Sequence, residues 1–159
     1  MALNVASHYP DRPQLLAAMA DLAVEELSHY REVVRVMLDR GIHPSPDSKD
    51  PYIHQLTAHI RRGREHYLLD RLLVGAVVER RGAERFGLVA AALKSPAAEH
   101  HDLHGFYNAI TSSEQRHWEQ FVRLAEHECP EQDVTARLDE LTEVEADIVQ
   151  SLPWRPALH

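Results

Sequence analysis

The hydrophobic positions of this chain recur every three or four residues over most of its length, which is typical of amphipathic helices rather than strands. Prolines, glycines and short polar turns divide this pattern into segments. Six helices are predicted, at residues 1–8, 14–39, 52–62, 66–93, 103–126 and 132–151. Gly41 is the expected stop of the second segment. The pattern predicts an all-α bundle that forms a single domain over residues 1–159.

Three of the apolar faces are interrupted near their middle by acidic or imidazole side chains. The interruptions are Glu26 and His29 in the second predicted helix, Glu79 in the fourth, and Glu114 and His117 in the fifth. Residues three apart in a helix project from one face, so the Glu and His of each pair point the same way. Because a buried carboxylate needs compensation, a bound metal ion is one explanation. Glu-x-x-His is the spacing that di-iron sites in helical bundles use.

Position on an apolar face is not sufficient evidence for a metal ligand. In a chain with twelve histidines, a Glu-x-x-His spacing also arises by chance. Glu145 lies on the apolar face of its own helix as well, and such a residue can be satisfied by an arginine. Glu84 competes with Glu79, but it lies about 140° around the helix from it. Pairing with an arginine, or a hydrogen bond to a ligand histidine, is the better prediction for Glu84.

Composition and charge exclude several classes of protein but say little about the chemistry of this one. The formal net charge is −8, so the chain as a whole is not a nucleic-acid-binding polycation. Its single cysteine, Cys129, excludes an internal disulfide framework and favours a reducing cytoplasm. No apolar run approaches the ~20 residues that cross a bilayer, and the first residues lack the pattern of a signal peptide. The expectation is a cytoplasmic protein that does not engage a membrane.

Three runs of sequence closely resemble the tRNA hydroxylases that act on methylthio-isopentenyladenosine, a family of ferritin-like non-haem di-iron monooxygenases. The runs are LAVEELSHY (22–30), LLDRLLVGAVVERRGAERF (68–86) and FYNAITSSEQRHWEQFVRLA (106–125). The resemblance implies a ferritin-like four-helix bundle with an additional short helix and a C-terminal helix. It also implies two iron ions, held by Glu26, His29, Glu79, Glu114 and His117. Glu84 matches a second glutamate of the family in that helix, either as an alternative ligand or as a residue that hydrogen-bonds a ligand.

The resemblance implies O₂-dependent hydroxylation of the isopentenyl group of 2-methylthio-N6-isopentenyladenosine in tRNA. Two electrons would come from an external donor, because the chain contains no flavin or nicotinamide motif. The family's first helix carries a further ligand glutamate upstream of the segment that matches residues 2–10, and no acidic residue precedes Asp11 here. We therefore expect a truncated first helix, with weaker iron binding than in a longer form; the alternative is a natural variant with a damaged site.

A tRNA partner requires positive surface. The candidates are two arginine clusters: Arg61, Arg62 and Arg64, and Arg80, Arg81 and Arg85. The alternative is that these arginines pair with the acidic residues of an ordinary surface. Two other functions compete with the hydroxylase: another ferritin-like di-iron oxidase or peroxidase, and a non-catalytic helical binding protein whose metal site has decayed.

Overall fold

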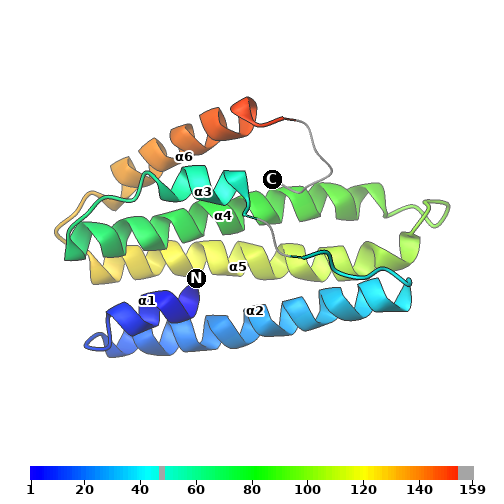
Figure 1. Cartoon of the computed structure of the whole chain (residues 1–159), viewed down its shortest axis with the longest axis horizontal. Coiled ribbons are helices and arrows are strands. Elements are labelled where there is room, and N and C mark those ends of the chain that lie inside the picture. The colour runs from blue at the N-terminus through cyan, green and yellow to red at the C-terminus, as the bar shows by residue number, and fades with distance from the viewer. Residues whose placement is uncertain (47–48, 154–159) are drawn as a thin grey trace. The chain divides into compact units, whose positions relative to one another are not determined.

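A computed structural model of the chain describes residues 1–46 and 49–153, and within these ranges it contains helices and no strands. The elements are α1 (Ala2–His8), α2 (Pro13–Asp39), α3 (Pro51–Thr57), α4 (Arg64–Ala92), the 3₁₀ turn η1 (His101–Leu103), α5 (His104–Glu128) and α6 (Val134–Ser151) (Figure 1). Each of the six predicted helices is present, so the all-α prediction is confirmed. None of the described helices has an apolar stretch that could span a lipid bilayer.

The chain divides into two compact units, Met1–Asp50 and Pro51–His159. In the first unit, α1 folds back along the N-terminal part of α2 (Figure 1). The buried apolar residues of this unit are Ala2, Val5, Ala6, Tyr9, Leu15, Met19 and Leu22. Pro13 opens α2, at the first helical position, where the missing N–H of proline costs nothing.

The end of α2 is set by Gly41, as predicted. Gly41 has a positive φ of 69°, a backbone conformation that glycine adopts without strain. The Gly41 N–H donates to the Leu38 carbonyl at 2.9 Å, and the Ile42 N–H donates to the Met37 carbonyl at 2.9 Å. This pair of bonds is the Schellman arrangement, which satisfies carbonyls that the end of a helix leaves exposed.

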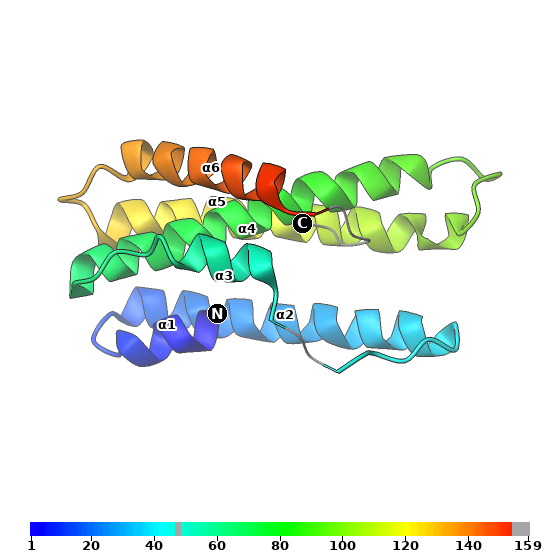
Figure 2. The ribbon, with the colours of Figure 1, turned by 45° about the horizontal axis from the view of Figure 1, so that its top comes forward.

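In the second unit, α4 and α5 form a long antiparallel pair, and α6 and α3 pack over it (Figures 1 and 2). The buried residues of this unit are mostly apolar; those that are essentially inaccessible to solvent include Leu68, Leu69, Leu72, Leu73, Ala76, Phe121, Ala125 and Leu141. Asp133 caps α6, because its carboxylate accepts from the Ala136 N–H at 2.9 Å. The extensive packing of α4 against α5 fixes which positions of the two helices face one another.

One predicted boundary is wrong, since α3 ends at Thr57 rather than near residue 62. The cause is the buried carboxylate of Asp70, which draws the following segment out of the helix. Asp70 accepts the backbone N–H of Arg61 at 2.8 Å and its guanidinium at 2.8 Å. The Arg137 guanidinium of α6 donates to the same carboxylate at 2.8 and 3.0 Å, and also to the His59 carbonyl. Tertiary hydrogen bonds thus outweigh the local helical pattern.

The pKa of Asp70 reflects this environment. Burial would raise the pKa of the carboxyl group, but the hydrogen bonds from Arg61 and Arg137 outweigh that effect and hold the pKa below its ordinary value. Asp70 is fully buried, so its charge depends on these two partners.

Candidate metal centre

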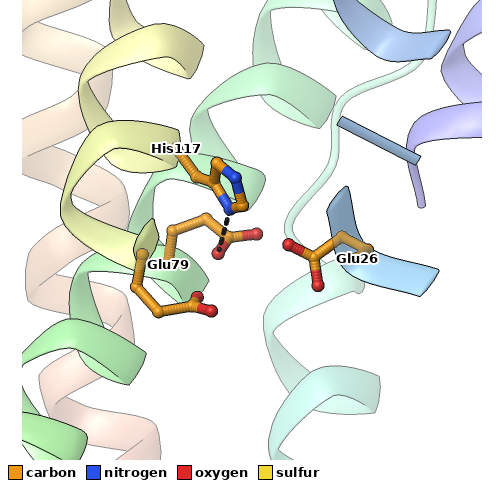
Figure 3. Close-up of side chains that lie close together, drawn as sticks. Glu26, Glu79 and His117 are labelled. Atoms are coloured by element: carbon orange, nitrogen blue, oxygen red, sulfur yellow. Dashed lines mark ion pairs between the residues drawn. The ribbon is translucent and has the colours of Figure 1, made fainter. Parts of the chain in front are cut away.

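The antiparallel pairing of α4 and α5 brings together three of the predicted metal ligands, Glu79, Glu114 and His117. One potential ligand atom of each residue lies within 4.8 Å of the others. Glu79 Oε2 is 3.7 Å from His117 Nδ1, an ion pair when the imidazole is protonated (Figure 3). The side chain of His117 is 1% exposed and that of Glu79 is 12% exposed, so the cluster lies largely out of solvent.

The donor chemistry of this cluster suits a transition metal. Two carboxylates and one imidazole supply oxygen and nitrogen ligands, the combination that non-haem iron and manganese sites use. The helices set these donors in place before any ion arrives, because all three sit at the middle of rigid elements rather than on loops. The cluster is therefore compatible with metal binding.

Gly82 belongs to this site and was not among the residues predicted from the sequence. It lies on α4, and a Cβ atom added to it would meet Glu114 Oε2 at 3.2 Å and Phe86 Cε2 at 3.5 Å. The available signal was a glycine inside a long helical pattern, which costs about 1 kcal/mol relative to alanine and calls for a packing reason.

The remaining predicted ligands, Glu26 and His29, lie one turn apart on α2, in the first unit. Their side chains face one another, with 3.7 Å between Glu26 Oε1 and His29 Nδ1. His29 is 20% exposed and Glu26 is 44% exposed. The two residues thus form the expected pair on one helical face. Their participation in a common centre stays a prediction.

Two other glutamates have partners that explain them without a metal. Glu84 lies 3.5 Å from Arg80 on the surface of α4, the arginine pairing that the sequence favoured. Glu145 is buried, and both of its oxygens accept from Arg81 at 2.6 Å. The Tyr52 hydroxyl also donates to Glu145. Hydrogen bonding to Glu145 raises the pKa of Arg81, while burial and then the Glu145 charge raise the pKa of Tyr52.

Comparison with known proteins identifies the family. The profile of the family described as tRNA-(MS[2]IO[6]A)-hydroxylase (MiaE) matches residues 1–159. The chain belongs to this family.

Two curated relatives of the tRNA hydroxylase family carry the name tRNA 2-(methylsulfanyl)-N(6)-isopentenyladenosine(37) hydroxylase. The protein of Pseudomonas putida is 31% identical over 150 residues, which cover 94% of this chain and 70% of that protein. The protein of Salmonella typhimurium is 34% identical over 138 residues, which cover 87% of this chain and 48% of that protein. The chain thus spans about half the length of the second relative.

A solved structure supports the predicted ferritin-like fold. The chain is similar to "Protein 43 with aldehyde deformylating oxygenase activity from Synechococcus", with a TM-score of 0.87 and 30% sequence identity. The match covers 98% of this chain and 75% of the other. The prediction of a ferritin-like helical protein is confirmed.

For a member of the tRNA hydroxylase family, the six candidate arginines differ in what they can offer to RNA. Arg61 and Arg81 direct their guanidinium groups at Asp70 and Glu145 inside the second unit. Arg62 and Arg64 are exposed on either side of the point where α4 begins. The other two lie further along α4, where Arg80 is half-exposed beside Glu84 and Arg85 is partly buried. Contact with tRNA by these residues stays a prediction.

Proposed function

We propose that this chain hydroxylates the isopentenyl group of 2-methylthio-N6-isopentenyladenosine in tRNA, in the cytoplasm, with a pair of iron ions as its cofactor. The observation that carries the proposal is the convergence of Glu79, Glu114 and His117 on the facing sides of α4 and α5. The family match over the whole chain supports the same activity.

The proposed ligand set is completed by Glu26 and His29 of α2. Di-iron sites in bundles draw a Glu-x-x-His pair from each of two helices and single glutamates from others. The pairs on α2 and α5, with Glu79 of α4, fit that scheme. The proposal takes residues 1–159 as one ferritin-like domain.

When bound, the iron pair would supply the reduction of O₂ that replaces a C–H bond of the substrate by C–OH. The balance is one O₂, two electrons and two protons, which yield the alcohol and one water. The electrons come from an external donor protein. Glu79 Oε2 and His117 Nδ1 lie 3.7 Å apart, so both atoms could hold the same ion. The buried side chains of Ala83 and Phe121, each four residues from a candidate ligand on the same helix, help to exclude water.

A turnover assay tests the proposal. The full chain, loaded with ferrous iron, is given O₂, a chemical reductant and tRNA that carries the modified adenosine. Mass spectrometry of the digested nucleosides should show the gain of one oxygen atom. The same assay with Glu114→Ala should show no product. Iron-loaded protein that leaves the nucleoside unchanged would refute the activity.

The similarity to an oxygenase with aldehyde deformylating activity gives a second candidate, the deformylation of an aldehyde by the same type of centre. The assay therefore includes a parallel reaction with an aldehyde in place of tRNA. Loss of the aldehyde without any change in tRNA would favour the second candidate. Tight tRNA binding without turnover of either substrate would favour a non-catalytic binding protein.

The tRNA partner gives a further prediction at the beginning of α4. Replacing Arg62 and Arg64 by glutamine should weaken tRNA binding, because two exposed cations that offset phosphate charge are lost. A plot of log affinity against log salt concentration has a negative slope, and this slope should become less steep by about 0.7–0.9 for each phosphate contact removed. Filter binding over a range of salt concentrations measures both quantities.

The control removes the same charge elsewhere. Arg31 on α2 and Arg123 on α5 are both exposed, and their replacement by glutamine changes the net charge equally. An equal loss of affinity in both double variants would show that the change in net charge, rather than the position of Arg62 and Arg64, weakens tRNA binding. Unchanged binding after substitution of Arg62 and Arg64 would exclude these residues from the footprint.

A further inference from the structure

Gly82 lies in the middle of α4, where glycine is an unfavourable choice. Its φ is negative, because the positive-φ glycines of the described chain are Gly41 and Gly63. No special backbone conformation therefore requires glycine here, and alanine would stabilise the helix by about 1 kcal/mol. The reason for glycine must be the space that a side chain would occupy.

That space borders the carboxylate of Glu114. A Cβ on Gly82 would come within 3.2 Å of Glu114 Oε2 and 3.6 Å of Glu114 Cγ. The first distance is shorter than an ordinary van der Waals contact, so the carboxylate would have to move by a few tenths of an ångström. The neighbour on the other side is Phe86, whose Cε2 would be 3.5 Å from the added atom. Phe86 packs against Tyr107 of α5, with ring centroids 6.1 Å apart, so it has limited room to yield.

We propose that Gly82 is a positioning residue for the metal centre. The bare backbone of α4 at this point lets the Glu114 carboxylate lie flush against the helix, within reach of the ligand atoms of Glu79 and His117. This inference rests on the proposed function, in which Glu114 is a metal ligand. It adds that the geometry of the ligand set depends on a residue that has no side chain.

Gly87 provides a matched control on the same helix. It also faces α5, but a Cβ there would meet only Thr111 Cγ2, at an ordinary contact distance of 3.5 Å. Gly87→Ala therefore repeats the change in helix propensity and in helix packing without touching a candidate ligand. Both substitutions should leave the thermal stability of the metal-free chain unchanged or slightly raised.

The experiment measures ferrous iron binding to the full chain by anaerobic titration calorimetry, and the visible absorption of the Co²⁺-loaded chain. Gly82→Ala should weaken iron binding by about 10–100-fold, the range found when residues that orient metal ligands are changed. Its Co²⁺ spectrum should also shift. Gly87→Ala should match the wild type in both measurements.

A double-mutant cycle shows whether Gly82→Ala weakens iron binding through Glu114 or through a general disturbance of the fold. Glu114→Asp shortens the side chain and should weaken binding by itself. In the background of Glu114→Asp, adding Gly82→Ala should cost little more, because aspartate has no atom at the place of Glu114 Oε2, the atom that the new Cβ would crowd. Additive losses would contradict the proposed contact.

The remaining outcomes are also decisive. Equal iron affinity in wild type and Gly82→Ala would overturn the inference and leave the proposed function standing. A lower thermal stability of the metal-free chain in Gly82→Ala, but not in Gly87→Ala, would contradict the positioning role and show that Gly82 serves helix packing alone. A wild-type chain that binds neither metal would overturn both the inference and the proposed function.

Discussion

Replacing His117 by alanine is expected to abolish metal binding and hydroxylation while leaving a folded chain. His117 is the most deeply buried of the candidate ligands, and water replaces a lost imidazole poorly at a site that excludes solvent. The loss of affinity should exceed the roughly 10–100-fold that follows from changing an outer-sphere residue. Elemental analysis after desalting, together with the tRNA turnover assay, measures the two effects.

His127 supplies the control for that substitution, because it lies on the same helix with a side chain that is 59% exposed. His127→Ala should keep full metal content and activity. Circular dichroism of both variants shows whether α5 stays folded. If His117→Ala retains stoichiometric metal, the α4–α5 cluster is not the metal centre.

The largest expected effect on stability comes from Asp70→Asn. The substitution keeps the shape of the side chain but removes a buried charge that two arginines surround. Breaking a buried ion pair costs about 3–5 kcal/mol, and the lower end applies here because Arg61 is 40% exposed. A loss of about 3 kcal/mol corresponds to a fall of roughly 6–12 °C in Tm for a domain of this size. Calorimetry of the metal-free chain measures it.

The same carboxylate predicts a dependence on pH. The pKa of Asp70 in the folded chain lies below its ordinary value of 3.8, so its contribution to stability is complete above that pH. The contribution is lost as the pH falls through the lowered folded value. The difference in stability between wild type and Asp70→Asn should therefore be constant near neutrality and shrink in acid. A constant difference throughout would show that the charge of Asp70 does not matter.

Glu140→Gln tests whether the burial of Asp70 is the reason for the large loss of stability expected in Asp70→Asn. Glu140 also accepts from Arg137, at 2.7 Å, but its side chain is 62% exposed. Solvent screens such a pair, so this variant should melt close to the wild type. Equal destabilisation by both substitutions would contradict the role assigned to the buried position.

The helices were predictable because their apolar faces are long and regular. The end of α2 at Gly41 and the two long helices α4 and α5 follow from the spacing of apolar residues and from local stop signals. The end of α3 did not follow, because it depends on hydrogen bonds between Arg61 and Asp70, nine residues apart. A local pattern contains no information about such a partner.

The candidate site was predictable for a related reason. Glu79, Glu114 and His117 interrupt apolar faces at mid-helix, where a polar group has to be compensated. Glu145 shows the limit of that argument, since it interrupts a face in the same way and is satisfied by Arg81. Gly82 was not found, because its contribution is an absence of atoms opposite a residue on another helix.

The most direct test of the central claim is an anomalous diffraction map, at the iron edge, of crystals of the full chain grown with ferrous iron under anaerobic conditions. We expect two peaks within coordination distance of Glu79, Glu114 and His117, with Glu26 and His29 completing the ligand set. A map with no peak beside the α4–α5 cluster, from protein that carries iron in solution, would contradict it.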